Sequence, residues 1–148
     1  MIEAIDVYHY DLNKLLDIWE RSVIETHNFI SKEMIESMRP EVLRGFASMD
    51  KVLIYTRNDA VTGFMGILNK KIEMLFLDPY YRGMGIGAIL VNAALNDYDV
   101  RFVDVNEQNF QAVGFYNSMG FVTVSRSDFD DAGRPFPILH LEYQRKNV

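Results

Sequence analysis

The stretch Leu75-Phe-Leu-Asp-Pro-Tyr-Tyr-Arg-Gly-Met-Gly-Ile-Gly-Ala-Ile-Leu90 joins a predicted strand to a predicted helix through three alternating glycines. Glycine is among the poorest helix formers, so Gly83, Gly85 and Gly87 must serve a purpose that depends on having no side chain. Glycine lets a backbone approach a ligand closely, and a helix N-terminus presents unpaired N–H groups to an anion. With Arg82 beside the glycines, the stretch predicts a phosphate or pyrophosphate site. The alternative is a tight turn whose glycines only allow close helix-strand packing.

Two nucleotide-binding patterns compete for this stretch. A Walker A loop ends in Gly-Lys-Ser/Thr, which is absent here, so a P-loop triphosphatase is excluded. A dinucleotide fingerprint is a closer competitor, because Gly83-x-Gly85-x-x-Ala88 satisfies its relaxed form and Asp104 follows about 20 residues later. In that fingerprint, however, the first glycine follows the strand directly, whereas here residues 78–82 intervene. A dinucleotide fold also needs further parallel β-α-β units. The stretch therefore favours the diphosphate of a ligand other than a dinucleotide.

Apolar periodicity and turn residues predict the elements on either side. The expected strands cover residues 2–8, 52–55, 61–68, 72–77, 100–105, 121–125 and 138–143. The expected helices begin at Asp11, Ser31, the glycines and Asn109, and Pro40 is expected to break or restart the second of them. The order β-α-α-β-β-β-α-β-α-β-β contains one β-α-β unit, so the strands at 72–77 and 100–105 should be parallel. The pattern predicts an α/β fold of the α+β type, with a mixed sheet covered by helices.

Composition narrows the function classes. The chain has 148 residues, 49% of them hydrophobic, which predicts a single packed domain over residues 1–148. The net charge of −6 argues against a nucleic-acid partner and suits an amine substrate. There is no cysteine for a disulfide or a thiolate site. No apolar run reaches the ~20 residues that span a bilayer, and no signal peptide is recognisable, so we expect a cytoplasmic location and no membrane partner.

Two ordered motifs resemble the GNAT superfamily of acyl-CoA-dependent N-acetyltransferases. The run Arg82-Gly-Met-Gly-Ile-Gly87 is similar to the Gln/Arg-x-x-Gly-x-Gly/Ala pyrophosphate loop of that superfamily. A second segment, Asn-x-x-Ala-x-x-Phe-Tyr-x-x-x-Gly-Phe, is matched by Asn109, Ala112, Phe115, Tyr116, Gly120 and Phe121. The resemblance narrows to a YjaB-type branch through Trp19-x-Arg-Ser-Val-x-x-Thr-His27-x-Phe29, Val105 to Tyr116, and Asp130-Asp-x-Gly-x-Pro-x-Pro137. It covers nearly the whole chain.

The resemblance implies a GNAT acyl-CoA N-acyltransferase fold, in which the strands that begin near Ile72 and Val100 splay apart and admit the pantetheine arm of coenzyme A. It implies acetyl-CoA as the acetyl donor. The backbone of three strand residues is expected to bind the pantetheine: Leu75, Phe76 and Leu77. The pyrophosphate is expected to lie against Arg82, Gly83, Met84, Gly85, Ile86, Gly87 and Ala88. Asn109 is expected to contact the cofactor arm.

Acetyl transfer to an amine needs an unprotonated nitrogen, donors for the developing oxyanion and a proton for the departing thiolate. Tyr116 is the candidate general acid, because it shares a helical stripe with Asn109 and Val113. Periodicity alone would make an aromatic residue there part of the core, and the motif match favours the catalytic role. By resemblance, the oxyanion donor is a backbone N–H of the strand at residues 75–77.

Glu73 is a candidate base, because it lies two residues before Leu75 on the same strand face and many members of the superfamily use an acidic residue of this strand. The alternative is a solvent-facing carboxylate beside Lys70 and Lys71. His27, at the end of the first helix, is either a second base or substrate contact, or a residue that stabilises the helix dipole.

The remaining charged residues are expected to be structural. Asp78 should fix the turn after the strand, and Asp104 and Glu107 should be capping or surface charges. No metal site is expected from the spacing of the three histidines, which are His9, His27 and His140.

The sequence therefore predicts an N-acetyltransferase that moves an acetyl group from acetyl-CoA to a primary amine, by direct attack in a ternary complex with Tyr116 as general acid. The acceptor, a small molecule or a peptide, should bind among Trp19, His27, Phe29 and the loop at 130–137. One alternative is a non-catalytic acyl-CoA sensor or interaction module, against which the presence of Tyr116 argues. The other is a dinucleotide-binding oxidoreductase. The expected assembly is a monomer or a homodimer.

Overall fold

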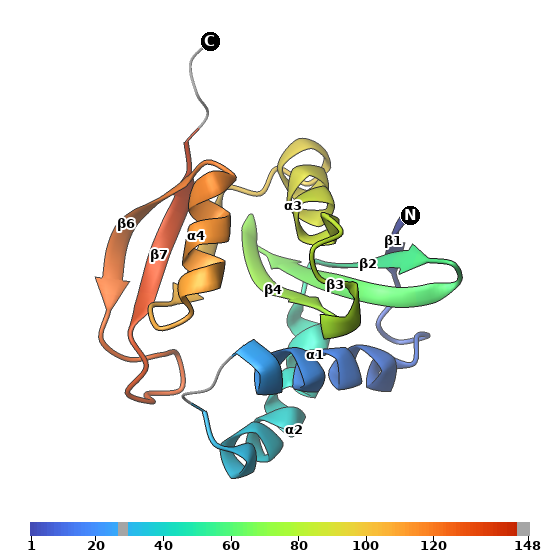
Figure 1. The fold of residues 1–148 in the computed structure, drawn as a ribbon, viewed down its shortest axis with the longest axis horizontal. Coiled ribbons are helices and arrows are strands. Elements are labelled where there is room, and N and C mark those ends of the chain that lie inside the picture. The colour runs from blue at the N-terminus through green and yellow to red at the C-terminus, as the bar shows by residue number, and fades with distance from the viewer. Residues whose placement is uncertain (27–29, 145–148) are drawn as a thin grey trace.

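Seven strands form one mixed sheet with helices on both faces in the computed structural model, which describes residues 1–26 and 30–144 (Figure 1). The strands are β1 (Ile2–Ile5), β2 (Lys51–Arg57), β3 (Ala60–Leu68), β4 (Lys71–Leu77), β5 (Phe102–Asn106), β6 (Phe121–Ser127) and β7 (Ile138–Tyr143). The helices are α1 (Leu12–Thr26), α2 (Lys32–Ser48), α3 (Ile86–Asp97) and α4 (Phe110–Ser118), with a short 3-10 helix, η1 (Pro79–Tyr81). The predicted order of strands and α-helices is confirmed, and η1 is the addition.

The sheet has the strand order β1-β2-β3-β4-β5-β7-β6. Neighbouring strands among the described residues are antiparallel except for β4 and β5, which are parallel as predicted. Two-residue turns at Asn58-Asp59 and Asn69-Lys70 connect the meander of β2, β3 and β4, and all four turn residues have positive φ. Such turns match the twist of the strands they join and set their register. The register fixes which side chains of β4 face the site.

Two buried clusters hold the sheet between its helices. On β3, the successive residues Phe64 and Met65 point to opposite faces and belong to different clusters. Phe64 packs in the cluster of α1 and α2, together with Leu15 and Phe46, and Met65 packs in the cluster of α3, together with Leu90. Figure 1 shows α1 and α2 on one side of β2–β4 and α3 on the other. A central strand buried on both faces is a rigid support for a neighbouring site.

The second helix runs without a break through Pro40, so the prediction that this proline breaks or restarts it is wrong. A proline inside a helix removes a hydrogen bond and costs about 3 kcal/mol. The helix tolerates that cost because Ser31 caps its start, accepting a hydrogen bond from the Met34 N–H at 3.2 Å, and because Ile35 and Phe46 are buried on its apolar face. Tertiary packing outweighs local propensity here.

β4 and β5 separate soon after they begin. They pair only at Lys71 with Phe102 and Ile72 with Val103, while β4 stays paired to β3 as far as Leu77. The edge of β4 that faces β5 is therefore without a strand partner beyond Ile72 among the described residues. The predicted splay is confirmed, and it opens the centre of the sheet.

Candidate active site

The turn after β4 positions the glycine segment. Asp78 caps η1, accepting a hydrogen bond from the Tyr80 N–H at 3.2 Å, and also pairs with Arg21 of α1 at 2.9 Å. The prediction that Asp78 fixes this turn is confirmed. The segment then turns back toward the start of α3.

Gly83 and Gly85 have φ angles of +78° and +77°, a left-handed conformation that favours glycine. A Cβ built on either residue meets no other atom within 4 Å, so the space beside both residues is open. Gly85 is also the N-cap of α3, whose first N–H groups have no partner within the helix. The two glycines thus form a hollow turn at the positive end of a helix, which is the arrangement an anion needs.

Gly87 has a different role in the structure. A Cβ at this position would lie 3.4 Å from the Phe115 ring and 3.6 Å from the Leu77 side chain. This glycine therefore allows α3 to pack closely against α4 and β4. The alternative role considered for the glycines, close helix-strand packing, therefore applies to Gly87. The left-handed turn and the open space are found at Gly83 and Gly85.

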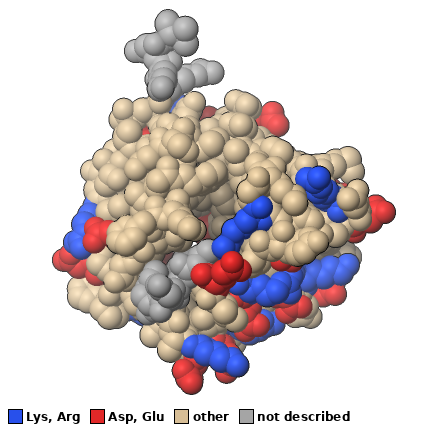
Figure 2. Space-filling view, viewed as in Figure 1, with Lys and Arg blue, Asp and Glu red and all other residues tan. Residues whose placement is uncertain are grey.

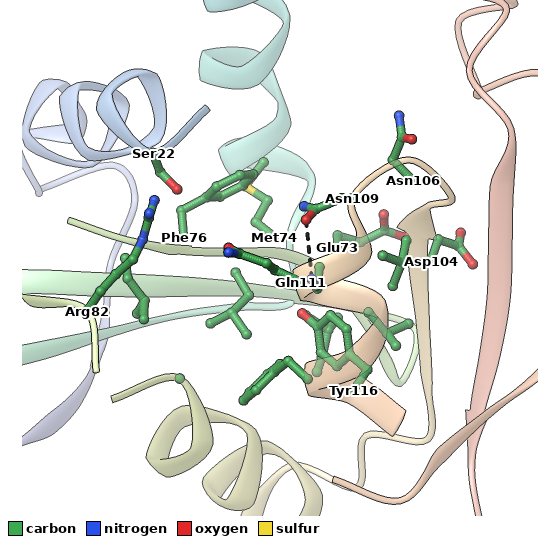
Figure 3. A pocket seen from close by; sticks show the side chains of 18 residues that line it. Ser22, Glu73, Met74, Phe76, Arg82, Asp104, Asn106, Asn109, Gln111 and Tyr116 are labelled. Carbon is green, nitrogen blue, oxygen red and sulfur yellow. Dashed lines mark hydrogen bonds between the residues drawn. The ribbon is translucent and has the colours of Figure 1, made fainter. Parts of the chain in front are cut away.

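Arg82 lines the cavity in the split between β4 and β5, and its guanidinium extends toward α1 beside Ser22 (Figure 3). Its Nη1 pairs with Glu25 of α1 at 3.2 Å. Its Nη2 is buried and has no hydrogen-bond partner in the part of the chain that the structure describes. A buried, unpaired donor is costly unless a ligand satisfies it. The chemistry of Arg82 therefore fits an anionic ligand.

The split between β4 and β5 holds a cavity of about 290 Å³. Residues 72–77 of β4 and 103–106 of β5 form two of its sides, and α4 closes it with Asn109, Gln111 and Tyr116 (Figure 3). Residues 75–77, expected to bind a pantetheine arm through their backbone, lie along this cavity at the unpaired edge of β4. The cavity runs beside Arg82 and Gly87, so it is continuous with the glycine segment.

Tyr116 lies in this cavity and also belongs to the core. Its side chain is 6% exposed and packs edge-on against Phe115 and Phe121, with ring centroids 5.1 and 5.6 Å away. Burial raises the pKa of its phenol well above the usual value. Its hydroxyl points into the cavity (Figure 3) and makes no hydrogen bond within residues 1–26 and 30–144. The expectation that this aromatic residue is part of the core is confirmed, and its role as an acid stays a prediction.

Asn109 is the N-cap of α4, and its side-chain oxygen accepts a hydrogen bond from the Ala112 N–H at 3.2 Å (Figure 3). It also lines the cavity. The residue expected to contact a cofactor arm thus fixes the start of the helix that carries Tyr116. Contact with a ligand remains a prediction.

A second hollow of about 350 Å³ lies next to this cavity, between α1, α2 and the loop before β7, and shares lining residues of β4 and β5 with it. Arg134 of that loop pairs with Glu41 of α2 at 2.9 Å and with Asp130 at 3.4 Å, which ties the loop to the helix. Trp19 is one of its lining residues although its side chain is 3% exposed and mostly in the core. The structure thus brings the predicted acceptor elements together. His27 and Phe29 lie outside the described residues.

The second hollow is acidic. Arg134 is the one basic residue among its described lining residues, whereas the acidic ones are Glu41, Glu73, Asp104, Asp130 and Asp131. Glu73 and Asp104 line both this hollow and the cavity. Figure 3 shows their carboxylates close together, at the far side of the cavity from Arg82. The two carboxylates are the charged residues among the five that line both spaces.

Glu73 pairs with Lys71 of the same strand at 3.2 Å, and its side chain is 26% exposed. Lys71 also donates to Asp104 at 2.9 Å. Burial disfavours the ammonium form, but the hydrogen bonds and charges of Asp104 and Glu73 outweigh it and raise the pKa of Lys71. Lys70 pairs instead with Asp99. Glu73 is thus a partly shielded, ion-paired carboxylate rather than a solvent-facing one.

Asp104 differs from its sequence-based interpretation as a capping or surface charge. It is 24% exposed and binds both Lys71 and His140, the latter at 2.7 Å. Asp104 and its two partners lie on three different strands, so no local spacing could have revealed these contacts. Sequence reasoning also missed Gln111 and Ser22, which line the cavity from α4 and α1.

The surrounding surface is unevenly charged. Figure 2 shows a face hollowed near its centre and largely uncharged over α3 and α4, with basic and acidic side chains gathered over α1.

Within the described residues, no group of three His, Asp or Glu side chains could share a metal ion. No described helix is long and apolar enough to cross a membrane.

Comparison with known proteins gives consistent matches. The family described as Acetyltransferase (GNAT) domain matches residues 15–142. The peptidyl-lysine N-acetyltransferase YjaB of Salmonella typhimurium is 41% identical over 142 residues, covering 91% of this chain and 93% of that protein. The solution structure of apo-form YjaB from Escherichia coli has a TM-score of 0.82 and 37% identity, covering 97% of this chain and 96% of that one.

A more distant structure shares the fold. The PaiA N-acetyltransferase from Thermoplasma acidophilum, crystallised in complex with coenzyme A, has a TM-score of 0.70 at 22% identity. It covers 97% of this chain, and this chain covers 98% of it. At that identity the likeness supports the fold.

Proposed function

The chain belongs to the GNAT acetyltransferase family, and on that premise we propose that it transfers the acetyl group of acetyl-CoA to the side-chain amine of a peptidyl lysine. Family membership and the YjaB-type resemblance predicted from the motifs are confirmed by the same matches. The chain is therefore an enzyme of the acetyltransferase class, which excludes a dinucleotide-binding oxidoreductase and argues against a purely sensory role. We propose the identity of the acetyl donor, the identity of the acceptor and the roles of the individual residues.

The observation that carries the proposal is the meeting of two differently built spaces at Glu73 and Asp104. One runs from Arg82 and Gly87 along the unpaired edge of β4 and passes Tyr116. The other is acidic and lies between α1, α2 and the tethered loop. Such a pair of spaces suits a reaction in which two substrates enter from opposite sides and react at the junction.

The residues present fit coenzyme A. The buried Nη2 of Arg82 and the open turn at Gly83 and Gly85 suit its pyrophosphate. The unpaired edge at residues 75–77 supplies backbone N–H and C=O groups for the amide bonds of a pantetheine arm. Asn109 lies where it could contact that arm. Bound acetyl-CoA supplies an acetyl group activated as a thioester.

Glu73 begins the proposed reaction by accepting, directly or through water, the proton that the lysine ammonium must lose. The freed nitrogen forms a bond to the acetyl carbonyl carbon, while a backbone N–H of residues 75–77 stabilises the oxyanion. As the carbon–sulfur bond breaks, Tyr116 donates its phenolic proton to the sulfur, and the nitrogen, now bonded to the acetyl carbon, gives up its remaining extra proton through solvent to restore the phenol. The products are an acetylated lysine and the free thiol of coenzyme A.

The burial of Tyr116 agrees with a role as acid. Because burial raises the pKa of the Tyr116 phenol, the group keeps its proton throughout the neutral range. The same desolvation makes a thiolate in the cavity a stronger proton acceptor, so the two groups stay matched. With no hydrogen bond to another described residue, the hydroxyl is free to donate toward the cavity.

Two observations favour a peptidyl lysine as the acceptor. The relatives with about 40% identity are named peptidyl-lysine N-acetyltransferases. The acidic hollow attracts a cationic side chain, and a long, flexible lysine can reach the junction from outside. A protein acceptor in this hollow needs only its lysine to enter.

An acceptor panel tests this proposal. Three peptides of one sequence are compared for acetyl-CoA-dependent release of free thiol: one with a lysine and a blocked N-terminus, one with arginine in place of lysine and a free N-terminus, and one with neither amine. We expect thiol release with the first alone, because the hollow is shaped for a side chain that reaches inward. Release with the second alone would overturn the lysine assignment while leaving acetyl transfer intact.

A further inference from the structure

Four ionisable side chains form an unbroken chain across the centre of the sheet. Glu73 and Lys71 of β4 are joined at 3.2 Å, Lys71 and Asp104 of β5 at 2.9 Å, and Asp104 and His140 of β7 at 2.7 Å. The Nε2 of His140 ends the chain at the Ser127 hydroxyl of β6, also at 2.7 Å. The four ionisable side chains are only 24–32% exposed. Solvent therefore screens their interactions less than those of ordinary surface pairs.

The sheet register creates this chain. The β3–β4 register shifts at Glu73, which has no residue opposite it on β3, and its carboxylate meets the Lys71 ammonium of the same strand at 3.2 Å. Asp104 lies directly opposite His140 in the β5–β7 register, on the face away from the buried Val103 and Val105. Because β4 separates from β5 after Ile72, the long Lys71 side chain bridges the strands at the point where the cavity opens. The chain thus ends at the carboxylate that the proposed reaction uses.

The hydrogen-bond directions follow from the groups involved. An ionised carboxylate only accepts, so the Nδ1–H of His140 donates to Asp104. In the neutral ring, Nε2 then accepts from the Ser127 hydroxyl. His140 and Ser127 therefore hold the Asp104 carboxylate in place beside the Lys71 ammonium.

The charges act on Glu73 in opposite directions. The Lys71 ammonium attracts the Glu73 carboxylate at 3.2 Å. Asp104 shares that ammonium at 2.9 Å and places a second negative charge nearby. A carboxylate bound to an ammonium alone would be a poor proton acceptor. The position of Lys71 between two carboxylates avoids that outcome.

We infer that Lys71 and Asp104 are positioning residues that set how strongly Glu73 attracts a proton, and that His140 keeps Asp104 in position. This inference rests on the proposed role of Glu73 as the base. Neither Lys71 nor His140 lines the cavity, so both act through Asp104 and Glu73 rather than on the substrates. Because the pKa of Lys71 is raised, its ammonium persists through the neutral range and the arrangement is stable there.

Other charged groups also face Glu73, and any pH profile includes them. The cavity adds Arg82 from the segment after η1. The acidic hollow adds Glu41 from α2 and, from the loop before β7, Asp130, Asp131 and Arg134. Arg134 already pairs with Glu41 and Asp130, so these groups partly neutralise one another.

Two substitutions with opposite expected effects test the inference. Lys71→Met removes the ammonium, so Glu73 should bind a proton more tightly, and the acid limb of the kcat/KM profile should move to higher pH. Asp104→Asn removes the second carboxylate, so the Lys71 ammonium pairs with Glu73 alone. The acid limb of the kcat/KM profile should then move to lower pH, and the plateau of the profile should fall. Each shift should be about one pH unit. His140→Ala should act like Asp104→Asn but more weakly, because an unanchored Asp104 holds Lys71 less well.

The chain offers matched controls. Lys70 and Asp99 form a pair at 3.0 Å next to Lys71 in the sequence but away from the cavity. Lys70→Met and Asp99→Asn should leave the profile unchanged. His9 pairs with Asp6 through its Nδ1 at 2.7 Å, as His140 does with Asp104. His9→Ala should therefore also leave the profile unchanged.

A second readout separates this inference from the proposed function. The protonation midpoint of an isotope-labelled Glu73 carboxyl group, followed by NMR, reports the effect of Lys71 and Asp104 without any turnover. Opposite shifts of that midpoint in the two variants support the positioning role. Shifts in the same direction, or none, overturn it. If the midpoint moves and the rate profile does not follow, or if Glu73→Gln keeps full turnover, the base role fails while the positioning effect stands.

Discussion

Tyr116→Phe is expected to lower kcat by roughly 10²–10⁴-fold, the usual contribution of a general acid, and to leave acetyl-CoA affinity unchanged. Phenylalanine keeps the ring contacts with Phe115 and Phe121, so the core and the shape of the cavity should persist. The hydroxyl has no hydrogen-bond partner among the described residues, so its removal should change the melting temperature little. Single-turnover kinetics and a binding titration measure the two effects separately.

The pH dependence gives a further check on Tyr116. A general acid loses activity as pH rises through its own pKa, and burial raises the pKa of Tyr116. The wild-type rate should therefore show no alkaline loss from this group in the usual assay range. Tyr98→Phe, on a tyrosine that does not line the cavity, is the control. A Tyr116→Phe enzyme with normal kcat would remove the residue from the acid role.

Gly85→Val is expected to weaken acetyl-CoA binding by at least about tenfold, or ~1.4 kcal/mol. The substitution places a branched side chain in the open space at the start of α3, where the proposal puts the pyrophosphate. It also forces a β-branched residue to φ near +77°, which costs roughly 1–2 kcal/mol of stability. Isothermal titration and thermal melting measure the two effects.

Gly133→Val separates strain from ligand contact. Gly133 has φ of +78°, and a Cβ there also meets no atom within 4 Å, but it lies in the loop before β7. The backbone strain should therefore match that of Gly85→Val, whereas acetyl-CoA affinity should stay at the wild-type value. Equal loss of affinity in both variants would attribute the effect to strain and contradict the pyrophosphate assignment.

The sequence predicts those parts of the fold that depend on local chemistry. The Ser31 cap, the turn at Asn58-Asp59 and the glycine turn were all recognisable because each needs a particular residue at a particular place. Pro40 was misjudged because its local preference is outweighed by packing of the helix face. The same limit applies to Gly87, whose role depends on Phe115 of another helix.

The same distinction applies to the candidate site: local motifs in the sequence identified some of its residues, whereas contacts between distant strands could not be predicted. Motifs identified Arg82, Asn109 and Tyr116, and the structure places all three along one cavity. The contacts among Lys71, Asp104 and His140 depend on three strands that meet only after folding, and no spacing in the sequence encodes them. The prediction that Glu73 shares a strand face with Leu75 because of their spacing is wrong, since the β3–β4 register shifts at Glu73 and the alternation of side chains breaks there.

The central claim is that acetyl-CoA lies in the split between β4 and β5 with its pyrophosphate at the glycine turn. The most direct test is an NMR titration of isotope-labelled protein with acetyl-CoA, following the backbone amides. We predict that the largest changes occur at residues 75–77 and 83–88, and that β1 and the β6 edge change little. Saturating acetyl-CoA without changes at these two segments, or with its main changes elsewhere, would contradict the account.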